Sequence, residues 1–525
     1  MSATHNPHPH KASSAESEWA SPEPYGGELQ APPRAAPTLG RAAWAGPQPV
    51  SRSIAGRLAA PVAVCLLWSG CGDKIEVKNY DPPAEPSAGN WSTFAVGDPA
   101  ELAVPPPPAA GSSEAQADER ELERIVKGRD LAQERSARYW AQEPTIRPWI
   151  DAALNLVTLR NRSDPVTASR AYALVSVAMN DAAVAAWRWK YRYRRKPPSG
   201  ATLLPRTKDP SYPSEHAAIA AAAARVLAYA FPERAPATFE EMASRAGRSR
   251  TVAGVSFPSD VRAGLALGRS VGDAVVKRAR SDGSSREFDG QRPRGRGFWE
   301  PPPGSDAPPV QPLAGTWRPW ILNAGSRLRP PPPPAFDSPE LKAQARRVMD
   351  VGERLKPEQR RIAKRWEGGA GTPQVPGIWN QRALTRVDRK GLSTPRVARL
   401  FALLNMSMAD AGIAAWDSKY TYWFPRPQNA VRNLGLDRTW KPLLRTPLSP
   451  AYVAGRSAFS AAAVQVLGHI FPDSAKSFRA KGAEAGAAGV YGGTQYPFAD
   501  QAGLAMGRSV GQLVVERARS DGAER

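Results

Sequence analysis

Apolar positions recur at helical spacing over most of the chain beyond Ala117. The first such pattern, residues 117–140, is charged and amphipathic, and from Asp151 onward stretches rich in Ala, Leu and Val alternate with breaks marked by proline. Apolar residues three and four positions apart indicate helices that bury one face. Small residues at intervals within these helices would let neighbouring helices approach closely. The pattern predicts an all-α protein.

Proline marks the segments between the helical patterns. The chain has 54 prolines, with runs at Pro105–Pro108, Pro301–Pro303 and Pro330–Pro334. Proline lacks a backbone N–H and clashes with the preceding turn, so these segments cannot form helix interiors or central strands. We predict a flexible spacer before the first helices and a linker in the middle of the chain.

The helical region is a tandem repeat. Three segments recur in the same order: residues 185–193 as 414–422, 210–233 as 450–473, and 262–283 as 501–522. The last pair reads RAGLALGRSVGDAVVKRARSDG and QAGLAMGRSVGQLVVERARSDG, and the three offsets are 229, 240 and 239 residues. This period is far longer than that of a solenoid repeat, so each copy should form a domain-sized helical bundle.

These observations predict five segments. They are a leader (1–71), a disordered Pro-rich stalk (72–115), a first bundle (116–283), a Pro-rich linker (284–335) and a second bundle (336–525). Three tryptophans of the linker, Trp299, Trp317 and Trp320, are expected to pack it onto the bundles rather than to bind a ligand.

The leader carries a candidate export signal. A short apolar stretch, residues 58–70, follows two arginines and is too short and too broken by Pro61 to span a membrane, which suits a secretory signal. It ends in Trp-Ser-Gly-Cys71, which resembles a bacterial lipobox with its leucine one place early. Cys71 is therefore a candidate for lipidation, and a plain cleaved signal is the alternative. The only other cysteine is Cys65, so no intrachain disulfide is expected in the body. The sequence predicts an exported protein of the cell envelope.

The charge balance is strongly basic. The formal net charge is +22, from 71 Lys and Arg against 49 Asp and Glu. Such a balance predicts attraction to anions, whether phosphate, nucleic acid or anionic lipid, and does not select among them. Genomic composition rich in arginine is an equally simple explanation. Because export is predicted, we do not expect a nucleic-acid partner.

Spaced motifs in the two copies give a specific resemblance. The second copy has Lys419 followed by Arg426-Pro427, which matches K-x6-RP, and the first copy has Pro-Ser-Glu215-His216, which matches PSGH apart from the glutamate. Ser249-Arg250, with Asp260 further on, matches SR-x5-H-x3-D except at its histidine. Over residues 150–525 the chain resembles the PAP2 acid phosphatase/vanadium haloperoxidase superfamily. The resemblance implies two tandem helical bundles of that type.

The resemblance also implies roles for these positions. Lys, two Arg, a Ser hydroxyl and backbone N–H groups would neutralise and orient a phosphate or vanadate ion. The histidine of the third motif would attack phosphorus or ligate vanadium, and the Asp would fix its tautomer. The PSGH histidine would be the general acid. The implied reactions are phosphoric monoester hydrolysis without a metal, or vanadate-dependent halide oxidation.

The first copy keeps part of this set. The residues kept are Lys190, His216 (general acid position), Ser249, Arg250 and Asp260 (histidine-orienting position). Pro197 stands where the motif arginine is expected, although Lys196 or Arg195 could substitute after a shift. Ser256 replaces the nucleophilic histidine, and a serine without an adjacent base is a poor nucleophile. Survival of Arg250 as an ion-pair partner of Asp260 is the alternative to anion binding.

The second copy keeps a different part. Lys419 and Arg426 are intact as oxyanion-binding candidates. The other positions are degenerate: Arg456 replaces the acid histidine, Ala488-Gly489 replaces Ser-Arg, Gln495 replaces the nucleophile, and Ala499 replaces the Asp. A site pooled from Lys419, Arg426, His216 and Arg250 is disfavoured, because in the family each bundle closes its own pocket.

Histidine is scarce, which limits the chemistry. The chain has five histidines, of which only His216 and His469 lie in the body. His469 aligns with Tyr229 in an apolar helix and is expected to be a core or helix-end residue. Neither copy can therefore assemble the family's two-histidine site. No metal and no cofactor are expected, and vanadate, which the resemblance allows, is disfavoured.

Two functions follow from these predictions. The first is a PAP2/vanadium haloperoxidase-like envelope protein whose ancestral catalysis is weak or lost. The second is a non-catalytic scaffold that binds phosphate or phospholipid headgroups through basic pockets. The expected partners are a phosphate-containing small molecule or lipid headgroup, and a membrane surface reached through the lipid anchor.

Overall fold

The structure is a computed structural model, and it describes residues 84–141, 145–160, 164–388 and 390–524. All of these residues belong to the unit Asp73–Arg525. The predicted leader, including Cys71, and the first part of the predicted stalk lie outside the described residues. Among the described residues one stretch, Thr394–Asn433, is long and apolar enough by composition to cross a membrane, but its 18-residue apolar window is buried inside the protein, as in a core helix.

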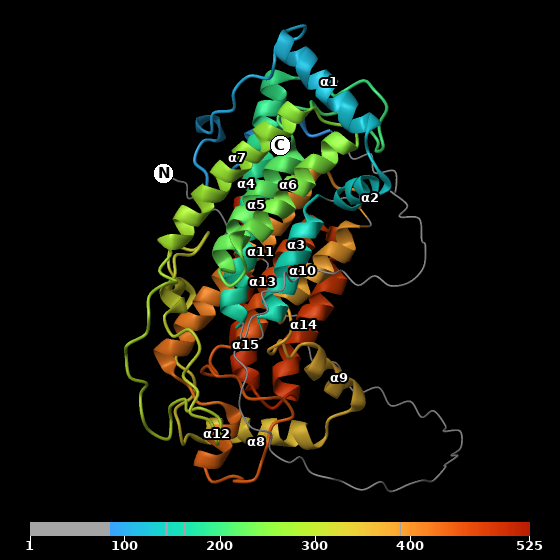
Figure 1. The fold of residues 1–525 in the computed structure, drawn as a ribbon. Helices are drawn as coiled ribbons and strands as arrows, with labels where there is room; N and C mark the ends of the chain where they lie inside the picture. The colour runs from blue at the N-terminus through green and yellow to red at the C-terminus, as the bar shows by residue number, and fades with distance from the viewer. Residues whose placement is uncertain (1–83, 142–144, 161–163, 389, 525) are drawn as a thin grey trace, which may run out of the picture. The chain divides into compact units, whose positions relative to one another are not determined.

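The described residues form α-helices, short 3₁₀ turns and loops, and contain no β-strand, which confirms the predicted all-α class. The first repeat contains α1 (Ser113–Lys127), α2 (Leu131–Trp140), α3 (Arg147–Leu159), α4 (Pro165–Tyr193), α5 (Glu215–Ala230), α6 (Pro236–Val252) and α7 (Pro258–Arg280). The second contains α8 (Pro339–Glu353), α9 (Pro357–Arg365), α10 (Gln374–Val387), α11 (Thr394–Tyr422), α12 (Pro427–Asn433), α13 (Gly455–Ile470), α14 (Ala475–Tyr491) and α15 (Pro497–Arg519). Figure 1 shows both sets.

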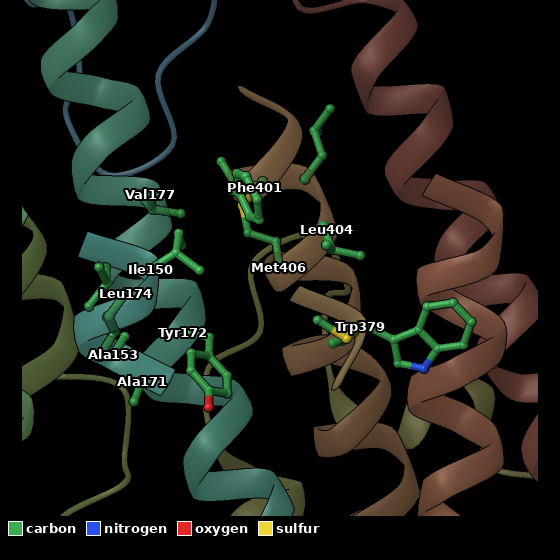
Figure 2. Packing of buried hydrophobic residues seen from close by; sticks show 14 of the residues in the cluster. Ile150, Ala153, Ala171, Tyr172, Leu174, Val177, Trp379, Phe401, Leu404 and Met406 are labelled. Atoms are coloured by element: carbon green, nitrogen blue, oxygen red, sulfur yellow. The ribbon is translucent and has the colours of Figure 1, made fainter. Parts of the chain in front are cut away.

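The two bundles share one hydrophobic core. The two longest helices, α4 and α11, pack against each other, and buried residues of both repeats form a single cluster. In Figure 2, Leu174 and Val177 of α4 lie on one side of this cluster and Phe401 and Leu404 of α11 on the other. The Asn405 side-chain amide also donates across the interface to the Ser176 hydroxyl at 2.9 Å. Because burying apolar surface contributes about 25 cal/mol per Å², neither bundle would be stable with this face exposed to water.

Glycines on α7 and α15 allow the closest helix contacts within each bundle. A Cβ added at Gly268 would lie 2.1 Å from the carbonyl oxygen of Ala218 on α5, and one added at Gly507 would lie 2.2 Å from that of Ala458 on α13. The matching positions in the two repeats confirm the close approach that the small residues predicted. Any larger side chain at either glycine would force the two helices apart.

A buried aspartate in the middle of each long helix binds an extended segment. We call residues 84–107 the first strap and residues 310–333 the second strap. Asp181 of α4 accepts backbone N–H groups of residues 94–96 in the first strap, at 2.8–3.1 Å. Asp410 of α11 accepts those of residues 320–322 in the second strap, at 2.7–2.9 Å.

The straps correct the predicted boundaries. Residues 84–107 were assigned to a disordered stalk, but Trp91 and Val104 are buried and Tyr193 of α4 donates its hydroxyl proton to the carbonyl of Val104 at 2.6 Å. Tyr422 of α11 makes the equivalent bond to Pro330 at 2.7 Å. Each strap is therefore part of a repeat, and the second repeat begins inside the predicted linker. Trp299 and Trp317 are buried, as expected for residues that pack the linker.

Each strap also contacts the end of the other repeat. The N–H of Ser92 in the first strap donates to the carbonyl of Asp521 after α15, and the N–H of Arg318 in the second strap donates to that of Asp282 after α7, both at 2.8 Å. The carboxylate of Asp282 in turn pairs with Arg170 of α4 at 2.7 Å, and that of Asp521 with Arg399 of α11 at 2.6 Å. The two repeats are thus interlocked at both ends.

Candidate functional site

The three motifs of each repeat meet at one end of its bundle. The first motif follows α4 or α11, the second begins α5 or α13, and the third joins α6 to α7 or α14 to α15. The long helices end in the same way, since Arg194 (φ 52°) and Trp423 (φ 48°) both adopt the left-handed conformation. This turn stops the helix and sends the chain across the end of the bundle.

In the first bundle a carboxylate occupies the cationic site. Glu215 stands at the position of the motif glycine. Its Oε2 forms an ion pair with Lys190 Nζ at 2.8 Å, and its Oε1 lies 2.9 Å from His216 Nδ1. Lys190 also donates to the carbonyl of Pro210, and its side chain is almost wholly buried. Burial raises the pKa of the Glu215 carboxyl, but the nearby Lys190 and His216 outweigh it and hold that pKa well below its usual value. Glu215 is therefore a fixed anion beside Lys190.

The other ring nitrogen of His216 is also engaged. Its Nε2 lies 2.9 Å from the hydroxyl of Thr145, which precedes α3. The general acid position is thus held between Thr145 and Glu215 inside the first bundle. His469, by contrast, lies at the end of α13 and contacts Glu524 at 2.8 Å, as expected for a helix-end residue.

Arg195 neutralises the histidine-orienting aspartate of the first bundle. Its guanidinium pairs with Asp260 at 2.8 Å and with Asp118 of α1 at 2.9 Å, and stacks on the Phe257 ring at 4.1 Å. Burial raises the pKa of Asp260, and Arg195 partly opposes that shift. The ion pair seen on Asp260 therefore comes from Arg195, whereas the sequence had offered Arg250 as its partner. Arg195 does not supply the missing motif arginine, because two carboxylates hold it.

The remaining candidates of the first bundle are buried. Ser249 donates its hydroxyl proton to the carbonyl of Ala246 at 2.6 Å, so that proton is committed to the helix. Arg250 and Ser256 are also buried, and the N–H of Ser256 donates to the carbonyl of Arg250 at 3.3 Å. Both nitrogens of His216 are engaged elsewhere, so His216 is not poised to activate Ser256 as a nucleophile.

In the second bundle two cations are buried, and no carboxylate of the described residues pairs with them. Lys419 and Arg426 are 2% and 5% exposed. Lys419 Nζ donates to the carbonyl of Pro450 at 2.6 Å and lies 5.6 Å from the centre of the Trp416 ring. Arg426 is held by neutral acceptors: its Nε and Nη2 donate to the backbone and hydroxyl oxygens of Ser449 at 2.6 and 3.0 Å, and its Nη1 donates to the Thr494 carbonyl at 3.0 Å.

Gln495 occupies the place of the nucleophilic imidazole. Its Oε1 accepts from Arg426 Nη1 at 2.9 Å, and its Nε2 donates to the Ala451 carbonyl at 2.5 Å. The displaced aspartate does not compensate, because Asp500 accepts the hydroxyl proton of Ser457 on α13. Ala499, at the orienting position itself, contributes only its carbonyl, which accepts from the Ala454 N–H at 2.9 Å.

A third cation, Arg456, lies beside these two. It is half-buried at the start of α13, and its Nη2 donates to the carbonyl of Glu367 at 3.1 Å. Its Nε is buried and has no hydrogen-bond partner in the described part of the chain. A Cβ added at Gly489 of α14 would lie 3.0 Å from Arg456 Nη1. The guanidinium therefore lies against the position where the motif places an arginine.

Burial lowers the pKa of all three cations, and neighbouring positive charge adds to this effect for Lys419 and Arg426. Burial, followed by the charges of Arg426 and Arg456, holds the pKa of Lys419 well below its usual value. Burial and then Arg456 lower the pKa of Arg426 to about 9, and burial lowers that of Arg456 to about 10. Among the described residues, no carboxylate forms an ion pair with any of the three. Asp500 and Glu367 act on Arg456 without pairing with it, so the positive charge of the second site is only partly offset, whereas the first site carries its own anion.

Comparison with known proteins agrees with this geometry. Residues 170–280 match the PAP2 superfamily model, and residues 399–483 match the model of the VCPO second helical-bundle domain. A stretch of 120 residues, 18% of the chain, is 33% identical to the vanadium chloroperoxidase of Curvularia inaequalis and spans 19% of that protein. The two model matches, one in each repeat, and this relative support the PAP2/vanadium haloperoxidase superfamily.

Solved structures show the same fold. A bacterial vanadium-dependent iodoperoxidase superposes with a TM-score of 0.59 and 24% identity, over 71% of this chain and 95% of its own. An apo-type bacterial vanadium-dependent chloroperoxidase superposes with a TM-score of 0.54 and 15% identity, over 69% and 95%. The predicted family and the helical two-bundle architecture are confirmed.

The structure therefore brings the predicted residues together in two separate groups. Lys190, His216 and Asp260 belong to the first bundle, and Lys419, Arg426 and Gln495 to the second, with no pooled site. Sequence reasoning missed the counter-anion role of Glu215 and the position of Arg456. The sequence contained a signal for both, because Glu215 replaces the motif glycine and Arg456 replaces the motif histidine, and each replacement adds a charge.

Proposed function

We propose that this protein binds a tetrahedral oxyanion of the phosphate class in its second bundle and does not turn it over. The observation that carries this proposal is the contrast between Lys190, which is paired with Glu215, and Lys419, whose partners among the described residues are the neutral Pro450 carbonyl and the Trp416 ring. Burying a charge without a counter-charge is costly, so such groups are usually paired. An oxyanion would supply the missing charge and accept the remaining N–H donors of Lys419 together with the one Nη2 donor of Arg426 that Ser449 does not bind.

The residues present do not support phosphoryl transfer. Attack on phosphorus needs a nucleophile that an adjacent base activates. The nucleophile positions are Ser256 and Gln495, and the Gln495 amide is already bonded to Arg426 and Ala451. The general acid position of the second bundle is an arginine. An arginine remains protonated at neutral pH and therefore cannot donate and recover a proton there.

Vanadate held by a bond to histidine does not fit either bundle for the same reason. The resemblance requires an imidazole at position 256 or 495, and neither position has one. The cations of the second bundle can hold vanadate only as they would hold phosphate, through charge and hydrogen bonds. Phosphate, sulfate, vanadate and a phosphomonoester headgroup therefore share one binding chemistry here. Location in the cell envelope remains a prediction.

Removing the Lys419 charge should abolish most of this binding. A hydrogen bond to a charged group contributes about 1.5–3 kcal/mol, so Lys419→Met should weaken the affinity for inorganic phosphate by about 10- to 150-fold. Isothermal titration of the purified protein measures this change. Lys441→Met is the matched control, because Lys441 is exposed and its loss removes one surface charge only. No heat of binding to the unaltered protein, or equal affinities for all three proteins, would refute the proposal.

A hydrolysis assay separates binding from catalysis. With p-nitrophenyl phosphate the protein should release product no faster than buffer alone, while phosphate still binds. Product release that depends on Lys419 would instead make the second bundle an enzyme.

Sulfate binding should weaken as the pH rises. Sulfate keeps its full charge throughout, so its affinity reports the protonation of the protein. The pKa of Lys419 is depressed, so its positive charge is present below that pKa and is lost as the pH rises through it, well before an ordinary lysine titrates. The affinity should fall from neutral pH towards pH about 9, the pKa of Arg426. A flat profile over this range would contradict the assigned ligands. Lys441→Met should leave the profile unchanged.

A further inference from the structure

We propose that Arg456 is a third oxyanion ligand of the second bundle, and that it supplies from α13 the guanidinium that α14 lost at Gly489. This inference rests on the proposed function, because it names a further ligand of the same site. Read along the sequence, Arg456 and Gly489 are two separate departures from the motif. In space the two positions are neighbours, so the arginine lost from α14 and the arginine gained on α13 can be understood as one exchange.

The steric evidence lies at Gly489. A Cβ at this position would meet Gln495 Cβ at 2.9 Å, which requires a shift, and Arg456 Nη1 at 3.0 Å, where the guanidinium would have to give by a few tenths of an ångström. A side chain at position 489 and the observed Arg456 therefore compete for the same space. In the first repeat the equivalent residues keep the motif order, with His216 on α5 and Arg250 on α6. The two bundles thus carry the arginine on different helices.

The hydrogen bonding of Arg456 leaves it available to a ligand. Arginine has five N–H donors in a planar fork. One Nη2 donor is bonded to the carbonyl of Glu367, and Nε is buried without an acceptor among the residues that the structure describes. A buried donor without an acceptor costs about 1–3 kcal/mol, and a bound oxyanion is the kind of acceptor that would satisfy it.

The surrounding charges also favour an anion. The acidic groups near enough to act on Arg456 are Asp500 and Glu367, and neither forms an ion pair with it. Asp500 is held by the Ser457 hydroxyl. The other charged groups that act on Arg456 or are acted on by it are Lys419 and Arg426. An anion bound between these three cations would be in contact with more positive charge than the protein itself offsets.

Phosphate titration of Arg456→Met tests this ligand. Loss of a charge-assisted donor should weaken the affinity for inorganic phosphate by about tenfold or more. Arg456→Lys keeps the charge without the planar fork, so its affinity should lie between those of the unaltered protein and Arg456→Met. Arg479→Met, which removes an exposed arginine of α14, is the control for net charge and should leave the affinity unchanged. Thermal unfolding of each variant checks that it is folded.

A double-mutant cycle tests the exchange itself. Gly489→Ala should displace the Arg456 guanidinium and weaken phosphate binding, and this loss should be smaller in the Arg456→Met background. Equal losses in both backgrounds would show that residues 456 and 489 act independently and would overturn the inference. So would phosphate binding to Arg456→Met at full affinity. Failure of the unaltered protein to bind phosphate would instead refute the proposed function, so the two failures are distinguishable.

Discussion

Replacing Glu215 by glycine should destabilise the unliganded protein and make its stability depend on phosphate. The change restores the motif sequence Pro-Ser-Gly-His but removes the carboxylate that pairs with Lys190 at 2.8 Å. Lys190 is only 1% exposed. Removing one partner of a buried ion pair lowers the free energy of unfolding by about 3–5 kcal/mol. Phosphate could take the place of the lost carboxylate beside Lys190 and His216. A ligand at a hundred times its dissociation constant would return about 2.7 kcal/mol.

Thermal unfolding with and without phosphate measures this effect. The melting temperature of Glu215→Gly should be well below that of the unaltered protein in buffer and should rise steeply with added phosphate. Titration should then reveal a second phosphate equivalent, in the first bundle. Glu233→Gly is the control, since Glu233 forms only a surface ion pair with Arg160. A Glu215→Gly protein as stable as the unaltered one, or one whose loss phosphate does not repair, would show that Glu215 is not acting as a built-in anion.

Replacing Asp410 by alanine should release the second strap from α11. The carboxylate accepts three backbone N–H groups, from residues 320, 321 and 322, and is wholly buried. Each buried N–H left without an acceptor costs about 1–3 kcal/mol, so the free energy of unfolding should fall by at least about 3 kcal/mol. Urea unfolding measures the change. Asp473→Ala removes an exposed carboxylate paired with Lys390 and should have little effect on the free energy of unfolding. Comparable losses in the two variants would mean that the strap is held by its apolar contacts alone.

Much of the fold could be predicted from the sequence because its determinants are local or repeated. Helical periodicity, proline positions and three matched segments fixed the class and the tandem organisation. The prolines also correctly excluded α-helix from the two straps, which contain only short 3₁₀ turns. They could not show that the straps pack, because the acceptor for residues 94–96 is Asp181, more than eighty residues away in an apolar helix. The aligned pair Trp91 and Trp317, each followed by a proline run, was the signal that could have revealed the straps as part of the repeat.

The candidate sites could be predicted only in part. Whether a substituted residue adds an anion-binding group or removes one depends on which side chains lie next to it in space. Glu215 was visible as a departure from the motif, but its ion pair with Lys190 arises from the packing of α5 on α4. Arg195 was visible as a substitute cation, but Asp118 and Asp260 hold it away from that role. Arg456 and Gly489 were read as two losses. Only the contact between α13 and α14 shows that one residue occupies the space of the other.

The exchange of end contacts between the repeats bears on how such a chain can evolve. Deleting either half would leave Asp282 or Asp521 without the backbone N–H from the opposite strap. The first repeat, in which Glu215 takes the place of a bound anion, therefore still has a structural role, because its strap bonds to the end of the second repeat. The duplication has made the halves structurally indispensable to each other, and this leaves each pocket free to diverge in its chemistry.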